Sequence, residues 1–124
     1  MSRENHNQIL ITISSLDEAM QRVRNAVKRL EAGLPPEQPI HRLSFVNEAI
    51  FLKTLSEKRM ELLKFLKKSG PLSRRQLAIK LSRAYANVHE DVKVLLRYRL
   101  IKTNAQQKLF VPWDEIRIDM RLAA

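Results

Sequence analysis

The chain has 124 residues, of which 44% are hydrophobic and 29% are charged, enough for one compact domain with a modest extension. It contains no cysteine, which excludes disulfides, thiolate chemistry and cysteine zinc sites and agrees with a reducing compartment. The first apolar stretch, residues 9–11, is broken by Thr12 and is too short for a signal-peptide core or a membrane span. We therefore expect a soluble, cytoplasmic protein with no membrane partner.

The positive charge of the chain is concentrated in one segment. The sequence has 23 basic and 13 acidic residues, a formal net charge of +10. Residues 53–102 hold 14 basic and 4 acidic side chains, whereas the rest of the chain holds 9 of each. Solubility alone would be served by charge spread over the whole chain. A confined basic excess is typical of a protein that binds a polyanion, and it favours nucleic acid over an anionic membrane surface.

The N-terminal region predicts a strand, an amphipathic helix and a linker. Residues 9–13 are rich in β-branched side chains that alternate between two faces, which indicates a strand. Ser14 or Ser15 can cap a helix that begins at Leu16. A Pro-rich stretch that ends near Ile40 then excludes helix. The helix has apolar residues spaced by 4, 3, 4 and 3 positions, namely Leu16, Met20, Val23, Val27 and Leu30.

The basic segment predicts three helices followed by a β-hairpin. Residues 43–45 are expected to lead into a short helical segment, and Ser56 is expected to cap the first of the three helices, which Gly70-Pro71 ends. Ser73 and Gln76 match a capping box at the start of the second helix. Periodicity predicts the third helix over residues 85–98, with Val88, Val92 and Leu95 pointing inward. Residues 100–103 and 108–111 predict the two strands of the hairpin, and alternation over residues 116–122 predicts a C-terminal strand.

This order of elements is that of a winged helix-turn-helix, in which the third helix enters the major groove of DNA. We therefore predict a mainly α, α+β fold. Residues 1–40 are expected to form the strand, helix and linker that serve dimerisation or partner binding. Residues 41–124 are expected to form a winged helix-turn-helix domain with a C-terminal strand.

Several motifs of the chain resemble a prokaryotic family of MarR-like winged-helix proteins. They include Leu43-Ser-Phe45, Leu55-Ser-Glu-Lys-Arg-Met-Glu-Leu-Leu63, Gly70-Pro-Leu-Ser-Arg-Arg-Gln-Leu-Ala78, Tyr85-Ala-Asn-Val-His89, Asp91-Val-Lys93, Leu100-Ile101 and Val111-Pro-Trp-Asp-Glu-Ile116. The resemblance covers about residues 40–118, and such proteins are described as DNA-binding regulators, several of them as antitoxins of toxin–antitoxin operons. It implies a dimeric transcriptional regulator that represses its own operon and binds a cognate toxin protein.

Two positions depart from the pattern of that family. Glu90 stands where a basic residue is common, and a carboxylate repels phosphate although it can accept a hydrogen bond from cytosine N4. Arg99 stands where glycine is common. A side chain there costs on the order of 1 kcal/mol if the residue is left-handed.

The candidate DNA contacts lie on the second and third helices and on the hairpin. Asn87 is the best candidate to read a base because its amide can bind adenine with two hydrogen bonds, although helix capping or solvation is about as plausible a role. For Tyr85, packing on the preceding helix competes with a phosphate or thymine contact. The full set is Ser73, Arg74, Arg75, Arg83, Tyr85, Ala86, Asn87, His89, Glu90, Lys93, Lys102 and Lys108. Most of the basic members are expected to contact phosphate.

The extra N-terminal helix and the two terminal strands require a partner surface, because a winged-helix unit closes its own core. We expect the terminal strands to pair within or between subunits and the helix to dimerise or to bind another protein. The candidate residues are Ile9, Ile11, Ile13, Leu16, Met20, Val23, Val27, Leu30, Ile116 and Ile118. A two-fold homodimer would place two recognition helices roughly 34 Å apart.

Nothing in the sequence indicates an enzyme, a cofactor or a metal. His6, His41 and His89 have no ligand-like spacing, and the acidic pairs are neighbours in sequence rather than a converging acid and base. Two glycines leave no phosphate-binding loop. Two other classes stay open: a winged-helix adaptor that binds protein instead of DNA, and an RNA-binding module, which is disfavoured because only 6% of the residues are aromatic.

Overall fold

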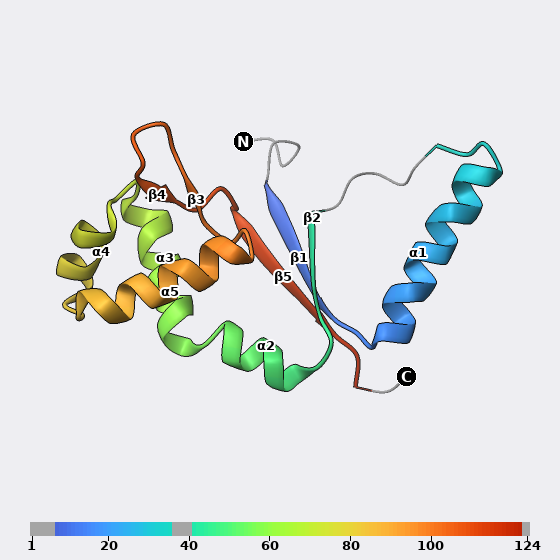
Figure 1. The fold of residues 1–124 in the computed structure, drawn as a ribbon, viewed down its shortest axis with the longest axis horizontal. Helices are drawn as coiled ribbons and strands as arrows, with labels where there is room; N and C mark the ends of the chain where they lie inside the picture. Colours follow the sequence, from blue (N-terminus) through green and yellow to red (C-terminus); the bar gives the residue numbers. More distant parts are fainter. Residues whose placement is uncertain (1–6, 36–40, 123–124) are drawn as a thin grey trace. The chain divides into compact units, whose positions relative to one another are not determined.

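The computed structural model describes residues 7–35 and 41–122, and over these it is an α+β protein with five helices and five strands (Figure 1). The chain divides into two compact units. We call Leu52–Asp114 with Asn7 the helical unit, and Gln8–Phe51 with the segment from Glu115 onward the sheet unit. The short helix α2 (Glu48–Thr54) contains the boundary between them.

The sheet unit is built on three parallel strands in the order β2-β1-β5. They are β1 (Gln8–Ile13), β2 (His41–Phe45) and β5 (Glu115–Met120). Ile11 in the centre pairs with Leu43 on one side and Ile118 on the other. The predicted pairing of the N- and C-terminal strands is therefore confirmed, and it occurs within one chain. β2 was not predicted as a strand, because its apolar alternation is limited to Leu43 and Phe45 and the other three of its five residues are polar and exposed.

The helix of the sheet unit is α1 (Leu16–Glu31), and it begins where the sequence predicts. Its cap is Ser15, whose Oγ accepts a hydrogen bond from the backbone N–H of Glu18 at 3.2 Å. Gly33, just beyond its end, has a φ of +72° that favours glycine. No residue of α1 is buried. Residues 36–40 of the predicted linker lie outside the described residues.

The isoleucines of β1 belong to the core of the chain and not to its surface. Ile9, Ile11 and Ile13 are 3%, 0% and 7% exposed. These three residues were predicted to lie at a dimer or partner interface, and their burial within one chain leaves little of each side chain accessible to a partner. The two candidates on β5 differ from them, since Ile116 is half-buried and Ile118 is exposed.

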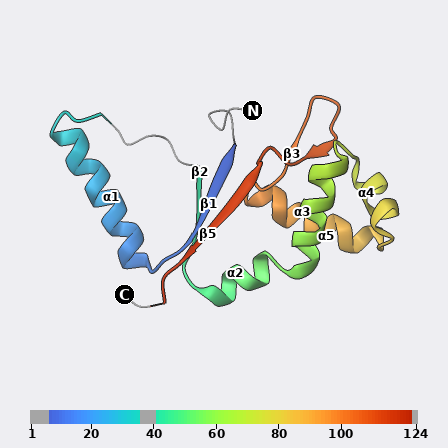
Figure 2. The ribbon, with the colours of Figure 1, turned by 180° about the vertical axis from the view of Figure 1, so that it is seen from behind.

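The helical unit contains α3 (Glu57–Ser69), α4 (Arg74–Leu81) and α5 (Tyr85–Arg97) (Figure 2). Ser56 caps α3, and Ser73 with Gln76 forms the predicted capping box of α4. The predicted positions of the three helices and their inward residues are confirmed. The apolar faces of the helices form one core with the segment that follows α5. Its fully buried side chains are Leu62, Leu66, Leu77, Val88, Val92, Leu95, Leu100, Ile101 and Leu109.

The hairpin is shorter than the sequence indicates. β3 (Lys102–Thr103) and β4 (Leu109–Phe110) pair antiparallel over two residues each, because Leu100 and Ile101 enter the core before β3 begins. Leu72, between α3 and α4, forms an isolated antiparallel bridge with Leu109 through backbone hydrogen bonds of 3.0 and 2.7 Å. This bridge ties the loop before α4 to the hairpin.

Candidate nucleic-acid interface

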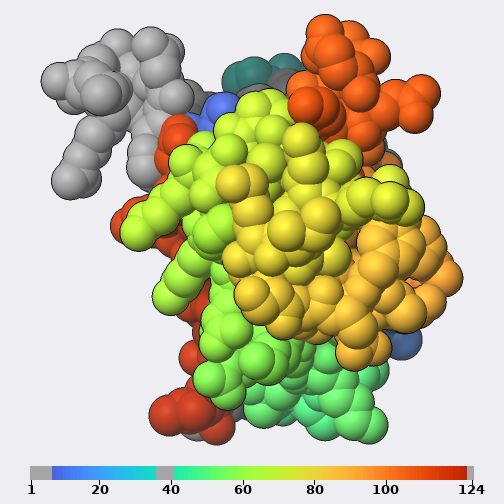
Figure 3. Space-filling model, turned by 90° about the vertical axis from the view of Figure 1, so that its left-hand side faces the viewer, coloured from blue at the N-terminus to red at the C-terminus, as the bar shows by residue number. Residues whose placement is uncertain are grey.

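The two helices α4 and α5 are joined by a turn of three residues, Ser82–Ala84. Ser82 has a left-handed φ of 54°, and its backbone N–H donates to the carbonyl of Ile79 at 3.1 Å. The next N–H, that of Arg83, donates to the carbonyl of Ala78 at 3.0 Å. These bonds close the end of α4 and turn the chain into α5 within three residues. In the view of Figure 3, α4 (yellow) lies at the front of the molecule, with the start of α5 beside it.

The start of α5 has one buried and one exposed face. Val88 and Val92 are 0% exposed and anchor the helix in the core. On the outer face, Tyr85 is 50% exposed and stacks on the ring of His89, with centroids 5.8 Å apart and the rings inclined by 17°. Six of the predicted DNA contacts thus lie on this one helix, and a seventh, Arg83, lies in the turn before it. Besides Tyr85 and the half-buried His89, the six include four exposed residues, namely Ala86, Asn87, Glu90 and Lys93.

One member of this group, Arg83, has a structural partner. Its Nη2 lies 2.7 Å from Oδ2 of Asp91, a residue that is only 8% exposed. The other oxygen of the same carboxylate accepts from Nε of Arg59 in α3 at 3.0 Å. Asp91 therefore binds two arginines and joins α3, the turn before α5 and α5 itself.

Asp91 was not among the predicted functional residues, although its place in the sequence carries a signal. Asp91 lies three residues after Val88 and four before Leu95, so it shares their buried helix face. A carboxylate on such a face requires paired charges or hydrogen bonds, because burying an isolated charge is costly. Arg59 is itself held in place, since its Nη1 also donates to the carbonyls of Lys53 and Thr54 at 3.1 and 3.0 Å.

The other predicted contacts lie at the start of α4 and on the hairpin. The Oγ of Ser73 accepts the backbone N–H of Gln76 at 3.1 Å, so this hydroxyl is committed to the capping box. Of the two arginines that follow it, Arg75 is exposed and Arg74 is half-buried. The two predicted contacts on the hairpin are Lys102 and Lys108.

These hairpin lysines have different surroundings. Nζ of Lys102 lies 5.9 Å from the centroid of the Trp113 ring. Lys108 is half-buried and closes the loop, because its backbone N–H donates to Oδ1 of Asn104 at 2.9 Å. Of the two, the exposed Lys102 is therefore the more accessible to a phosphate.

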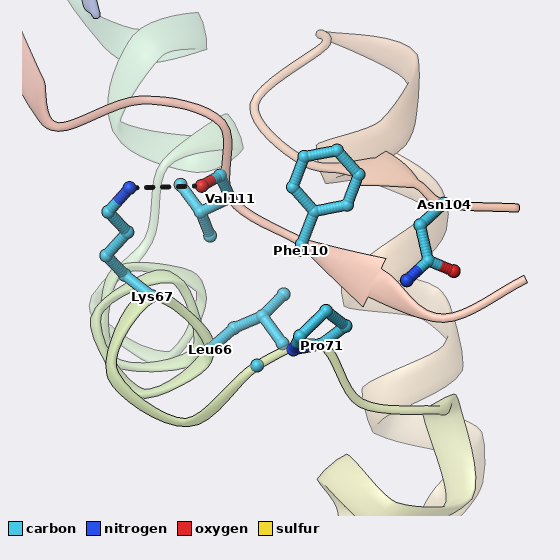
Figure 4. Close-up of a pocket in the computed structure, with 7 residues that line it drawn as sticks. Leu66, Lys67, Pro71, Asn104, Phe110 and Val111 are labelled. Carbon is cyan, nitrogen blue, oxygen red and sulfur yellow. Dashed lines mark hydrogen bonds between the residues drawn. The ribbon is translucent and has the colours of Figure 1, made fainter. Parts of the chain in front are cut away.

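Between the hairpin and the end of α3 lies a shallow, mostly apolar hollow of about 300 Å³ (Figure 4). Leu66, Pro71 and Phe110 line it, among other residues. At its edge, Nζ of Lys67 donates to the carbonyl of Val111 at 3.3 Å and lies 3.1 Å from Oδ1 of Asp114. Lys67 thus fastens the segment after the hairpin to α3, and its charge is paired.

Several other basic side chains of the helical unit have no carboxylate partner. Within residues 7–35 and 41–122, Arg74, Arg75 and Lys80 of α4 form no ion pair. By contrast, Lys93 lies 3.2 Å from Oε1 of Glu90 on the exposed surface. The helix α4 therefore brings unneutralised positive charge next to the outer face of α5.

The described residues contain no group of three or more His, Cys, Asp or Glu side chains that could hold a metal ion. They also contain no helix with the length and apolar character needed to cross a membrane.

The fold and the site define an α+β protein whose basic helical unit carries two consecutive helices joined by a short turn. A family model, HVO_A0114, matches residues 54–118, which is just over half of the 124 residues. The chain belongs to the HVO_A0114 family. The match runs from the end of α2 to within β5 and includes the whole α3–α5 core. Neither the comparison with curated proteins nor the comparison with solved structures gives a match.

Proposed function

We propose that the protein is a transcriptional regulator that binds specific sequences of double-stranded DNA as a homodimer. In this proposal the helical unit is a winged helix-turn-helix, with α5 as recognition helix and the β3–β4 hairpin as wing. The observation that carries the proposal is the two-faced α5, which anchors Val88 and Val92 in the core and exposes Tyr85, Asn87 and Lys93. It follows α4 after a three-residue turn, the length typical of helix-turn-helix motifs.

Phosphate contacts supply most of the affinity in this mechanism. Arg75 and Lys80 are exposed and have no ion pair in the described part of the chain, so both can bind phosphate oxygens. Arg83 plays another part here. Because Asp91 holds its guanidinium, Arg83 positions α5 and is a weaker candidate for direct phosphate contact than Arg75 or Lys80.

Base selectivity comes from the first turns of α5. Asn87 is exposed and can offer its amide to adenine in the major groove. Glu90 lies nearly one helical turn further on and pairs with Lys93 at 3.2 Å, so its carboxylate is partly neutralised on the surface. Even so, a carboxylate at this position disfavours close phosphate contact and suits a cytosine amino group.

The test combines selection of duplexes from a random DNA pool with two variants. We expect a two-fold symmetric site with half-sites roughly 34 Å apart. Asn87→Ala should weaken binding to that site by about 1–3 kcal/mol with little effect on random DNA. Arg75→Ala with Lys80→Ala should weaken binding to every sequence and lower the slope of log K against log salt by about 0.9 per lost contact.

The matched control is Arg42→Ala with Arg121→Ala, which removes the same charge from exposed positions of the sheet unit. The control should leave the salt slope close to that of the unchanged protein. Recovery of no motif, together with equal effects of both double variants, would contradict the proposal.

The resemblance to antitoxins extends the proposal to a cognate toxin protein and to repression of the protein's own operon, without catalysis. The alternative is an adaptor that uses the same fold to bind protein and not DNA. The two-residue strands of the hairpin and the exposed face of α1 favour this alternative. A stoichiometric protein partner, recovered together with no DNA retention at moderate salt, would establish it.

A further inference from the structure

The helix α1 turns its polar face toward its own sheet. Nη2 of Arg22 donates to Oγ of Ser14 at 3.2 Å and to Oγ of Ser44 in β2 at 3.3 Å. A hollow of about 340 Å³ lies beside these bonds, with Ser14 in its wall. The contact between α1 and the sheet is therefore made of polar groups. The residues of α1 that line the hollow lie three, four and seven positions after the first of them and so share one side of the helix: Glu18, Gln21, Arg22 and Asn25.

The apolar stripe of α1 consequently points away from the sheet. Its spacing of 4, 3, 4 and 3 gives a period of 3.5 residues, which keeps a seam straight along a partner helix in a coiled coil. A patch of this kind, rimmed by polar residues, marks an interaction surface. Its five members are between 45% and 68% exposed: Leu16, Met20, Val23, Val27 and Leu30.

The two flanks of the stripe differ in chemistry. One flank carries charges of both signs, with Asp17 in the first turn and Lys28 in the last. The other flank carries Ala19 and Ala26, each directly before an apolar member of the stripe. In a parallel pair of helices, the charged flank of each would face the alanine flank of the other. In an antiparallel pair, charged flank meets charged flank and alanine flank meets alanine flank.

We propose that the apolar stripe of α1 packs antiparallel against the stripe of a second copy of this chain. Asp17 of each copy then lies beside Lys28 of the other, and the small alanines let the two helices approach closely. Arg24, in the middle of the charged flank, is held on its own helix, since its Nη2 donates to Oε1 of Gln21 at 2.8 Å. The opposite ends of the helix dipoles also come together. This pairing deepens the proposed function, since it supplies the homodimer on which that function rests.

The size of the surface sets the strength of this dimer. A helix of 16 residues is about 24 Å long, so one helix pair buries less than the roughly 800 Å² per partner of a standard interface. We therefore expect a dimer that dissociates on dilution. Val23→Glu, which places a charge in the middle of the stripe, should weaken dimerisation at least about tenfold. Since Val23 is 56% exposed, this variant should keep the helical content of the unchanged protein.

The absence of cysteine in the chain allows a direct test of the orientation. Full-length variants Leu16→Cys and Leu30→Cys are treated, separately and mixed, with a short thiol cross-linker. In the antiparallel pair, the two copies of position 16 are roughly 21 Å apart along the axis, whereas position 16 of one copy lies beside position 30 of the other. Cross-links should therefore form in the mixture and not in Leu16→Cys alone. Asn25→Cys, on the polar face, is the matched control and should not cross-link.

Efficient cross-linking of Leu16→Cys with itself would overturn the antiparallel arrangement. A monomeric protein at all concentrations in sedimentation, without cross-links in any mixture, would overturn the pairing altogether. Neither measurement contains DNA. A failure of DNA binding therefore leaves this result standing. A monomer that still selects a DNA motif would refute the pairing and the homodimer of the proposed function, but not the sequence-specific DNA binding.

Discussion

At the scale of single residues, the adjacent carboxylates Glu90 and Asp91 have opposite surroundings. Asp91 is buried and binds Arg59 and Arg83 at 3.0 and 2.7 Å. Glu90 is exposed and pairs with Lys93 on the surface. An exposed pair contributes little to stability, whereas removing the charge of a buried carboxylate leaves its partners uncompensated. The two neighbours are therefore a natural pair of experiment and control.

We predict that Asp91→Asn lowers the free energy of unfolding by about 3 kcal/mol, because two half-buried guanidinium groups lose their counter-charge. Glu90→Gln should change it by less than about 0.5 kcal/mol. Urea unfolding followed by circular dichroism measures both. Equal destabilisation by the two variants would show that Asp91 does not hold the arginines together.

How far the sequence predicts single residues depends on what their neighbours in the chain reveal. Ser73 and Gln76 were predicted as a capping box because both partners lie within one helical turn. The left-handed conformation considered for Arg99 is present, with a φ of 62°, because the residue follows a helix end. The pairing of Arg59 with Asp91 was not predicted, since 32 residues separate the two and no local pattern specifies such a contact.

At the scale of elements, α5 begins without a side-chain cap. Its N-cap is Ala84, which forms no side-chain hydrogen bond, whereas α1, α3 and α4 all begin with a capping serine. Serine at an N-cap stabilises a helix by about 1 kcal/mol relative to alanine. The element proposed to read DNA is thus also one with little local support at its start.

We predict that Ala84→Ser raises the free energy of unfolding by roughly 0.5–1 kcal/mol, because the hydroxyl can accept a free backbone N–H of the first turn of α5. Ala84 is exposed and its backbone is already extended, with a φ of −59° and a ψ of 134°, so the substitution needs no rearrangement. Chemical denaturation measures the gain. Ala86→Ser, two residues further on, is the control and should bring none, since it stands inside the helix. A loss of stability in Ala84→Ser would contradict this account of the turn.

The elements that the sequence predicts well are those with a strong local pattern. The helices α1, α3, α4 and α5 all have caps, breakers or apolar periodicity that fix at least one end. β2 has only Phe45 buried and forms because β1 offers it a parallel edge. The sheet therefore depends on pairing between distant segments, which the pattern of a single segment does not contain.

At the scale of the whole molecule, the net positive charge and the apolar stripe of α1 lie in different parts of the chain. Residues 53–102 carry the whole net positive charge. The apolar stripe of α1 lies in the rest of the chain, where basic and acidic residues are equal in number. Electrostatic binding to DNA releases counterions and weakens steeply with salt, but association of apolar surfaces does not. The two proposed activities should therefore respond differently to ionic strength.

We predict that raising salt from about 50 to about 200 mM weakens DNA binding by about 10³-fold or more if at least about six phosphates are contacted, because each contact releases counterions. Self-association of the protein without DNA should change only a few-fold, since the α1 stripe is apolar and its charged flank contributes little in solution. Fluorescence anisotropy of a labelled duplex gives the first quantity, and sedimentation of the protein alone gives the second. If the DNA affinity and the self-association constant fell by similar factors as salt rises, self-association would depend on the same charges as DNA binding. The apolar stripe of α1 would then not be the source of self-association.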